Sequence, residues 1–234
     1  MNSGNLPEIT NRKPWPPDGI KWYYSDEATA IAHGDCRDIL PEIGKVDLVL
    51  TDPPYGMSYV SGRYANENPW GAIVGDEAYP IDLIPVWRDM ARKAVFAFCR
   101  WDTVGKLPQP DSFIVWAKNN HSAGDLEHQY ARKWEGVCFY AGPEHHFSER
   151  PCDVYDARRV PPQQLQHPTE KPVALCQWLI EPNTDMGDVI LDPFMGSGTT
   201  IRAALNLHRK AIGIEIEERY CEIAAKRMAQ AVLL

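Results

Sequence analysis

Short apolar runs, separated by turns and by helical patterns, constrain the fold of this 234-residue chain more than any other feature. Apolar runs of this length without polar alternation are typical of strands buried on both faces of a parallel sheet. Six such strands are predicted, over residues 29–33, 46–50, 94–99, 113–117, 189–191 and 211–214. Amphipathic helical patterns around residues 201–205 and 220–228 flank the last strands. This alternation predicts a doubly wound α/β fold.

The length suits one substantial core, so a single domain over residues 20–234 is predicted. Residues 1–19 are rich in proline and polar groups and are expected to form a flexible arm. Two long irregular segments, 56–79 and 142–168, are predicted as loops, and loops of that length are usually functional.

Composition excludes several classes of protein. No stretch approaches the ~20 apolar residues of a membrane helix, and the first residues show no secretory or transit signal, so a cytoplasmic protein without membrane contact is predicted. The six cysteines lack zinc-site spacing, and no metal is predicted. A net charge of −8 argues against coating nucleic acid by charge alone, but not against an enzyme that visits DNA.

The segment VILDPFMGSGTT, residues 189–200, reads as a strand, a glycine-rich turn and the start of a helix. The strand ends in Asp192, and Gly196 and Gly198 permit a sharp turn close to a ligand. A dinucleotide fingerprint would need a third glycine where Ile201 stands, and no phosphate-loop lysine follows. Glu215 ends the next strand, where a carboxylate can accept hydrogen bonds from ribose hydroxyls. The pattern indicates a nucleoside site without a pyrophosphate.

The segment VDLVLTDPPYG, residues 46–56, carries the second candidate site. A buried strand delivers Asp52 to its carboxyl end, where open α/β sheets bind ligands. Two prolines stiffen the following backbone and present the carbonyl of Pro53, while Tyr55 adds an aromatic face. Two acceptors and a ring suit a planar ligand that bears an amino group. A purely structural turn explains the two prolines but not this whole context.

With these motifs the chain resembles the amino-methyltransferases of DNA, which modify adenine N6 or cytosine N4. TDPPY resembles their catalytic motif and DPFMGSGTT their S-adenosylmethionine loop. HGDCRDIL at residues 33–40 and HPTEKP at residues 167–172 also stand where that family has related motifs. The motif order is similar to the circularly permuted β class. The resemblance covers the chain from about residue 28 onward and implies a Rossmann-like, S-adenosylmethionine-dependent methyltransferase fold.

The resemblance also implies a role for individual residues. Asp52 and the Pro53 carbonyl would accept hydrogen bonds from the amino group of a flipped-out base, and Tyr55 would stack on that base. The implied catalytic set is Asp52, Pro53, Pro54 and Tyr55. The implied cofactor set is Asp35, Thr169, Lys171, Asp192, Phe194, Gly196, Ser197, Gly198, Thr199 and Glu215.

Within the cofactor set, Asp35 would bind the adenine amino group and Glu215 the ribose hydroxyls. Thr169 and Lys171 would hold the methionine carboxylate, since a cation suits that group. Asp192 would face the methionine ammonium, with capping of its own turn as the alternative.

DNA is the expected partner, with adenine N6 as the favoured acceptor. The segment 142–166 is a short candidate for target recognition, and residues 58–70 could also contact bases. Three arginines, Arg150, Arg158 and Arg159, are candidate DNA contacts, through bases or through phosphates. A homodimer is the family-level expectation, whereas one chain gives no indication of a restriction-enzyme partner.

Other functions stay open at this point. A cytosine-N4 or an RNA adenine-N6 methyltransferase would share the chemistry, although Asp52 favours adenine because cytosine enzymes of the family often have serine there. A nucleotide-dependent oxidoreductase would use the glycine-rich turn but does not explain TDPPY. A catalytically silent DNA-binding module is disfavoured by the intact Asp52 and Tyr55.

Overall fold

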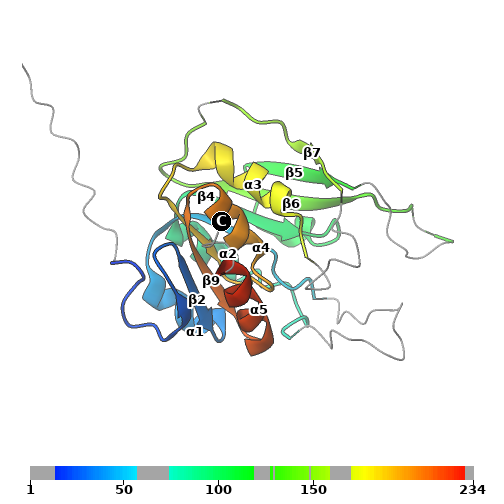
Figure 1. Cartoon of the computed structure of the whole chain (residues 1–234). Helices are drawn as coiled ribbons and strands as arrows, with labels where there is room; N and C mark the ends of the chain where they lie inside the picture. Colours follow the sequence, from blue (N-terminus) through cyan, green and yellow to red (C-terminus); the bar gives the residue numbers. More distant parts are fainter. Residues whose placement is uncertain are drawn as a thin grey trace, which may run out of the picture.

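In the computed structural model, residues 14–56, 74–118, 127–128, 130–147, 149–158 and 170–229 are described, and they form one nine-stranded sheet (Figure 1). The strand order is β1-β2-β9-β8-β3-β4-β6-β5-β7. The strands are β1 (Trp22–Ser25), β2 (Thr29–His33), β3 (Val46–Thr51), β4 (Ala91–Cys99), β5 (Ser112–Ala117), β6 (Trp134–Ala141), β7 (Val154–Asp156), β8 (Val189–Asp192) and β9 (Lys210–Glu215).

Five neighbouring strands, β2, β9, β8, β3 and β4, are parallel and make up the buried centre of the sheet. All six residues of β3 are buried, as its mainly apolar run predicts, and its two polar residues, Asp47 and Thr51, are buried with the rest. Helices cover both faces. One core cluster contains residues of α3 (Val173–Ile180), α4 (Thr199–Asn206) and α5 (Glu218–Ala229), and the other contains residues of α1 (Cys36–Ile43) and α2 (Leu83–Met90). The doubly wound α/β prediction is therefore confirmed.

The six predicted strands are present, but residues 113–117 differ from the prediction of a buried parallel strand. They lie in β5, which pairs antiparallel with β6, and only Ile114 and Trp116 of this strand are buried. Three strands were not predicted. β6 begins with polar and small residues, β1 and β7 are short, and β7 lies inside a segment that was expected to be irregular. These strands depend on pairing with neighbours rather than on their own apolar pattern.

The described end of the expected flexible arm packs against the body of the protein. The indole N–H of Trp15 donates to the Asp26 carbonyl at 3.0 Å, and that of Trp22 donates to the Pro17 carbonyl at 3.1 Å. The Lys210 ammonium lies 4.8 Å from the centre of the Trp15 ring. Residues 14–19 therefore belong to the folded body, while residues 1–13 lie outside the described part of the chain.

The mixed sheet decides which loops share an edge. The carboxyl ends of the five parallel strands lie together at one edge, and because β6 runs antiparallel to β4, its first residues lie at that same edge. The end of β6 lies at the opposite edge, where the Gly142 N–H donates to the Lys93 carbonyl at 2.8 Å. Residues that follow β6 therefore begin on the far side from the carboxyl ends of the parallel strands.

Helix α5 packs directly behind the turn that precedes α4. Gly198 has a φ of +84°, and a Cβ atom there would lie 3.0 Å from Ala224 Cβ and 3.3 Å from Met228 Cε. In the same region Arg227 Nη1 donates to Glu170 Oε1 at 2.9 Å and to the Ser197 carbonyl at 3.4 Å. The glycine-rich turn is thus held from behind by the last described helix.

We expect Gly198→Val to destabilise the fold through this contact with α5. Gly187 is a matched control, because it has a φ of +85° and no heavy atom within 4 Å of an added Cβ. Both valines suffer the left-handed backbone, but only the one at position 198 also overpacks α5. Chemical denaturation should give a free energy of unfolding lower by about 1–3 kcal/mol for Gly198→Val than for Gly187→Val. Equal values for the two variants would contradict this packing.

Candidate active site

A pocket of about 380 Å³ lies at the carboxyl ends of the parallel strands. This volume is in the range of small-molecule sites. Asp52, Pro53, Pro54 and Tyr55 line it, together with Asp35, Lys171, Asp192, Phe194, Gly196, Ser197, Thr199 and Glu215. The two motifs, which stand about 140 residues apart in the sequence, therefore share one pocket. Thr169 and Arg159 lie outside the described residues.

Gly198 differs from its expected position. It does not line the pocket and faces α5 instead, so the physical reason for a glycine there is the packing of that helix. Gly196, with a φ of +50°, is the glycine of the turn that does line the pocket.

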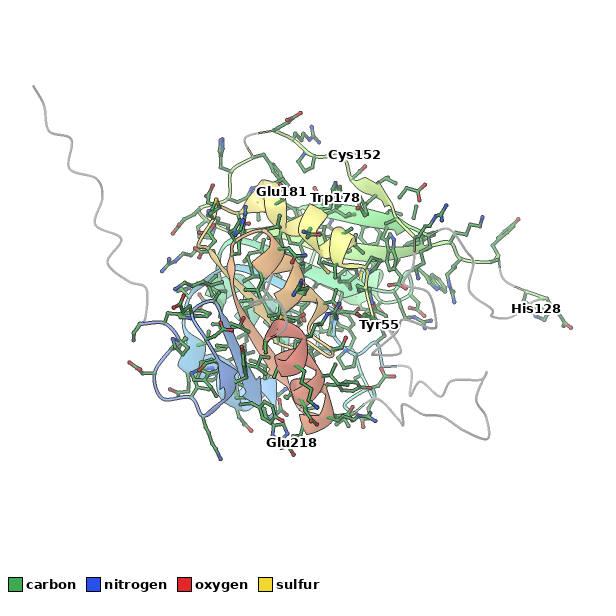
Figure 2. The ribbon with its side chains drawn as sticks, in the orientation of Figure 1. Tyr55, His128, Cys152, Trp178, Glu181 and Glu218 are labelled. Carbon is green, nitrogen blue, oxygen red and sulfur yellow. The ribbon has the colours of Figure 1, made fainter. Side chains whose placement is uncertain are left out.

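Asp52 follows β3, and both of its carboxylate oxygens already have partners. The Tyr55 hydroxyl donates to Oδ1 at 2.6 Å, and the Lys171 ammonium contacts Oδ2 (Figure 2 shows Tyr55). Burial raises the pKa of Asp52; the Lys171 charge opposes this rise and Glu135 adds to it. Burial and the nearby Asp52 charge likewise raise the pKa of Tyr55. Lone pairs remain on both oxygens, so a ligand can hydrogen-bond to Asp52 beside these two partners or in place of one of them.

Lys171 lies between two carboxylates. Its side chain is 7% exposed, and its Nζ contacts Asp52 Oδ2 and lies 3.4 Å from Glu135 Oε2. Burial lowers the pKa of Lys171, but the two carboxylates raise it further than burial lowers it, so the ammonium stays charged. Lys171 thus joins the catalytic motif to β6.

Glu135 is a site residue that the sequence did not reveal. It is the second residue of β6, and its Oε1 contacts the Lys118 ammonium. Burial raises its pKa, but Lys171 and Lys118 together hold the pKa below its usual value. A single acidic residue in an unpredicted strand carries no sequence signal, and only the pairing of β6 with β4 brings it to the pocket edge.

Asp192, at the end of β8, caps the turn that follows it. Its Oδ1 accepts from the Phe194 N–H at 3.1 Å, which is the capping role that the sequence left open. Burial raises the pKa of Asp192 to about 7, against the opposing effect of its hydrogen bonds. The side chain also lines the pocket, so it can face a cationic group of a ligand.

Glu215, at the end of β9, fixes the backbone of the glycine-rich turn. Its Oε2 accepts from the Gly196 N–H at 3.0 Å and its Oε1 accepts from the Glu217 N–H at 2.8 Å. Burial raises the pKa of this carboxylate, whereas the backbone N–H groups lower it. Lone pairs that remain on both oxygens can accept from hydroxyls in the pocket.

Two further cofactor candidates, Asp35 and Phe194, also have structural contacts. Asp35 is the N-cap of α1, and its Oδ1 accepts from the Arg37 N–H at 2.8 Å. The Phe194 ring packs edge-on against Trp87, with ring centres 6.1 Å apart. Both residues line the pocket, and these contacts fix their orientation.

Of the candidate DNA arginines, the two that the structure describes, Arg150 and Arg158, do not line the pocket. Arg150 precedes β7 and Arg158 follows it, and both are exposed. The Ala157 N–H donates to the carbonyl of Ala117, the last residue of β5, at 3.2 Å. This end of β5 is on the pocket side of the sheet, so Arg158 lies on that side too. Arg150 lies toward Cys152, which Figure 2 shows at the margin of the molecule and well away from Tyr55. The structure therefore separates two arginines that the sequence grouped.

Among the described residues, no group of three or more histidine, cysteine or acidic side chains could hold a metal ion. No helix in the same part of the chain is long and apolar enough to cross a membrane.

Comparison with known proteins gives consistent matches. A family model described as DNA methylase, for N6 and N4 enzymes, matches residues 109–226. The type II methyltransferase M.HpaI of Haemophilus parainfluenzae is 45% identical, over 80% of this chain and 69% of that protein. The DNA adenine methyltransferase YhdJ of Escherichia coli (strain K12) is 26% identical, over 88% of this chain and 84% of that protein. The crystal structure of the M1.HpyAVI–SAM complex aligns with a TM-score of 0.63 and 27% identity, covering 85% of this chain and 99% of that one.

We expect Asp192→Asn to change how stability depends on pH. The native pKa of about 7 exceeds the ordinary value of 3.8, so the native state retains a proton that the unfolded chain has lost between these two values. The contribution of Asp192 to stability therefore falls as pH rises through that window. Asparagine cannot ionise, and its oxygen can still accept from the Phe194 N–H. Thermal unfolding should show that the melting temperature of the variant rises relative to that of the wild type from about pH 4 to pH 8. A difference in melting temperature that does not change with pH would contradict a raised pKa for the buried Asp192.

Proposed function

Because the chain belongs to the N6/N4 DNA methylase family, we propose that it transfers the methyl group of its cofactor, S-adenosylmethionine, to the N6 atom of adenine in DNA. The observation that carries this proposal is the meeting of Asp52, Pro53 and Tyr55 with Asp192, Gly196 and Glu215 in one pocket. A DNA adenine methyltransferase among the relatives supports adenine as the acceptor.

The pocket suits the cofactor chemically. Several carboxylates line it, among them those of Asp35, Asp192 and Glu215, and S-adenosylmethionine carries a sulfonium, an ammonium and two ribose hydroxyls. Glu215 would accept from the ribose hydroxyls, Asp192 would face the ammonium, and Asp35 would accept from the adenine amino group. The turn from Phe194 to Thr199, including Ser197, would lie under the cofactor, with Gly198 supporting the turn from behind. Thr169 and Lys171 stay proposed for the methionine carboxylate.

The chemistry asks little of the protein beyond positioning. When bound, the cofactor supplies a methyl group on a positively charged sulfur, which is already strongly electrophilic. Asp52 and the Pro53 carbonyl would accept from the two N–H bonds of the target amino group and place its nitrogen in line with the methyl group. Pro54 would hold this backbone stiff. The Asp52 carboxylate would stabilise the positive charge that develops on the amino nitrogen as it takes the methyl group, until solvent takes up the proton that this nitrogen releases; the cofactor would leave as the neutral thioether S-adenosylhomocysteine.

Before a base binds, the oxygens of Asp52 are hydrogen-bonded to Tyr55 and ion-paired to Lys171, and the lone pairs that remain can accept from the target amino group. A base inside a duplex cannot reach the pocket and has to be flipped out, with the Tyr55 ring stacking on its face. Tyr55 would then release Asp52 to the base. Lys171 has a second acceptor in Glu135 at 3.4 Å, so its charge stays compensated if it also moves.

Further assignments extend the same proposal. The order of the motifs along the chain supports membership of the permuted β class, and residues 20–234 are proposed as one methyltransferase domain. Arg158, on the pocket side of β7, is a proposed DNA contact together with Arg159, whereas Arg150 lies on the other side of β7 and is not retained as a contact. DNA as substrate implies a cytoplasmic site of action. A homodimer is also proposed, on the resemblance alone.

The direct test is incubation of the protein with labelled S-adenosylmethionine and mixed DNA, followed by mass analysis of the nucleosides. We expect N6-methyladenine in the wild type. Asp52→Asn should lower transfer by about a hundredfold or more, since a preorganised charge in the site is lost. Calorimetry should show cofactor affinity within a few-fold, because Asp52 contacts the acceptor base. N4-methylcytosine would overturn the choice of adenine, and near-normal transfer by the variant would remove Asp52 from the catalytic set.

Substitution of Tyr55 tests base flipping. Tyr55→Phe keeps the ring and should stay active, whereas Tyr55→Ala should lose about 1–3 kcal/mol of stacking and slow transfer accordingly. The loss should be smaller on DNA with a mismatched target adenine, because unpairing then costs less. Fluorescence of 2-aminopurine at the target position reports the unstacking. Equal rates for the phenylalanine and alanine variants would show that the ring does not stack on the base.

A further inference from the structure

Exposed aromatic side chains gather at the pocket edge of the sheet, after β4 and before β6. Trp101 is 48% exposed, Tyr130 is 99% exposed and Trp134 is 37% exposed. Exposed large aromatic side chains grouped in this way are typical of interaction sites rather than of ordinary protein surface. Figure 2 shows His128, in the connection between β5 and β6, standing out from the body of the molecule.

This edge is continuous with the catalytic residues. Phe98 of β4 lines the pocket, and Trp101 follows three residues later, a span of about 11 Å at most. On the other side, Trp134 directly precedes Glu135, which lies 3.4 Å from the Lys171 ammonium, and Lys171 contacts Asp52. A molecule bound over Trp101 and Trp134 would therefore lie at the mouth of the pocket.

The charge of this edge is opposite to that of the whole chain. Arg132 and Lys133 stand between Tyr130 and Trp134, in a protein with a net charge of −8. The nearby Asp102 is paired with Arg100 through two hydrogen bonds, of 2.9 Å and 2.7 Å. The Arg132 guanidinium lies 5.6 Å from the centre of the Trp101 ring. A guanidinium beside an aromatic face combines phosphate binding with stacking, the two contacts that nucleic-acid sites use most.

The other candidate surface is less favourably placed. The segment that follows β6 starts at the opposite edge of the sheet, where Gly142 bonds to Lys93 at the beginning of β4. Arg150 belongs to this side of β7. A base held at Asp52 would have its flanking duplex nearer to Trp101 and Arg132 than to these residues.

We propose that duplex DNA flanking the flipped base docks on the surface formed by Trp101, Tyr130, Arg132, Lys133 and Trp134, which we name the aromatic edge. The inference rests on the proposed function and adds the place where the DNA lies. Arg132 and Lys133 neutralise phosphates, and Trp101 stacks against nucleotides next to the vacated base position.

Duplex affinity tests this surface directly. Anisotropy of a fluorescent duplex of random sequence would be measured for Trp101→Ala, Arg132→Ala and the control Arg150→Ala, in the presence of S-adenosylhomocysteine. Trp101→Ala should weaken binding about fivefold or more. Arg132→Ala should reduce the slope of log affinity against log salt by about 0.9, the effect of one lost phosphate contact. Arg150→Ala should bind like the wild type, and calorimetry should give unchanged cofactor affinity for all three.

The outcomes separate the two proposals. Wild-type affinity and salt slope in both Trp101→Ala and Arg132→Ala would overturn the aromatic edge, and weakened binding in Arg150→Ala alone would move the DNA to the other side of β7. Neither result would contradict the proposed function, provided that the wild type still methylates DNA. Absence of methyl transfer to any DNA by the wild type would instead overturn the proposed function, whatever the binding measurements give.

Discussion

The buried Lys171 ammonium, between the carboxylates of Asp52 and Glu135, is the interaction on which the rest of the site depends. The Lys118 ammonium contacts Glu135 and is the fourth charge of this group, so that two positive charges balance two negative ones. Buried charges are costly unless each has a partner, so removing any member leaves a charge uncompensated. The group also joins three distant parts of the chain: the end of β3, the start of β6 and the residues before α3. It therefore fixes the antiparallel side of the sheet against the parallel side, at the point where the two meet.

This arrangement means that a ligand meets an acceptor that is already partly occupied. The Asp52 carboxylate accepts from Tyr55 and is ion-paired to Lys171 before any base arrives, and burial has already raised its pKa. An incoming amino group uses the lone pairs that remain or takes the place of one of these partners, so the net gain from the hydrogen bond is modest and selection depends on the stacking and fit of the right ligand. Glu135 can keep the Lys171 charge compensated inside the protein when the ammonium moves.

The sequence predicted what depends on local pattern and missed what depends on pairing. Strands buried on both faces must be apolar throughout, so β2, β3, β8 and β9 were visible in the sequence. β6 was not, because it opens with Trp134, Glu135 and Gly136 and is defined by its neighbours on the two sides. Glu135 was missed with its strand, and the contact between Lys171 and Asp52 joins residues 119 positions apart. The sequence pattern indicated that Gly198 belongs to a tight turn. It did not indicate that a side chain there would collide with Ala224 and Met228, because these residues lie in a helix further along the chain.

The contact between α5 and the glycine-rich turn has a consequence for the order of synthesis. The residues around Asp52 leave the ribosome early, yet the turn at Gly198 acquires its backing only when Ala224, Arg227 and Met228 have followed. The Arg227 guanidinium is also the group that bonds to Glu170, next to Lys171. Chains fold as they emerge from the amino terminus, so a nascent chain has its acceptor carboxylate long before it has a supported cofactor loop. The pocket is completed only after residue 228 has been synthesised, and shorter nascent chains contain the TDPPY motif without a usable site.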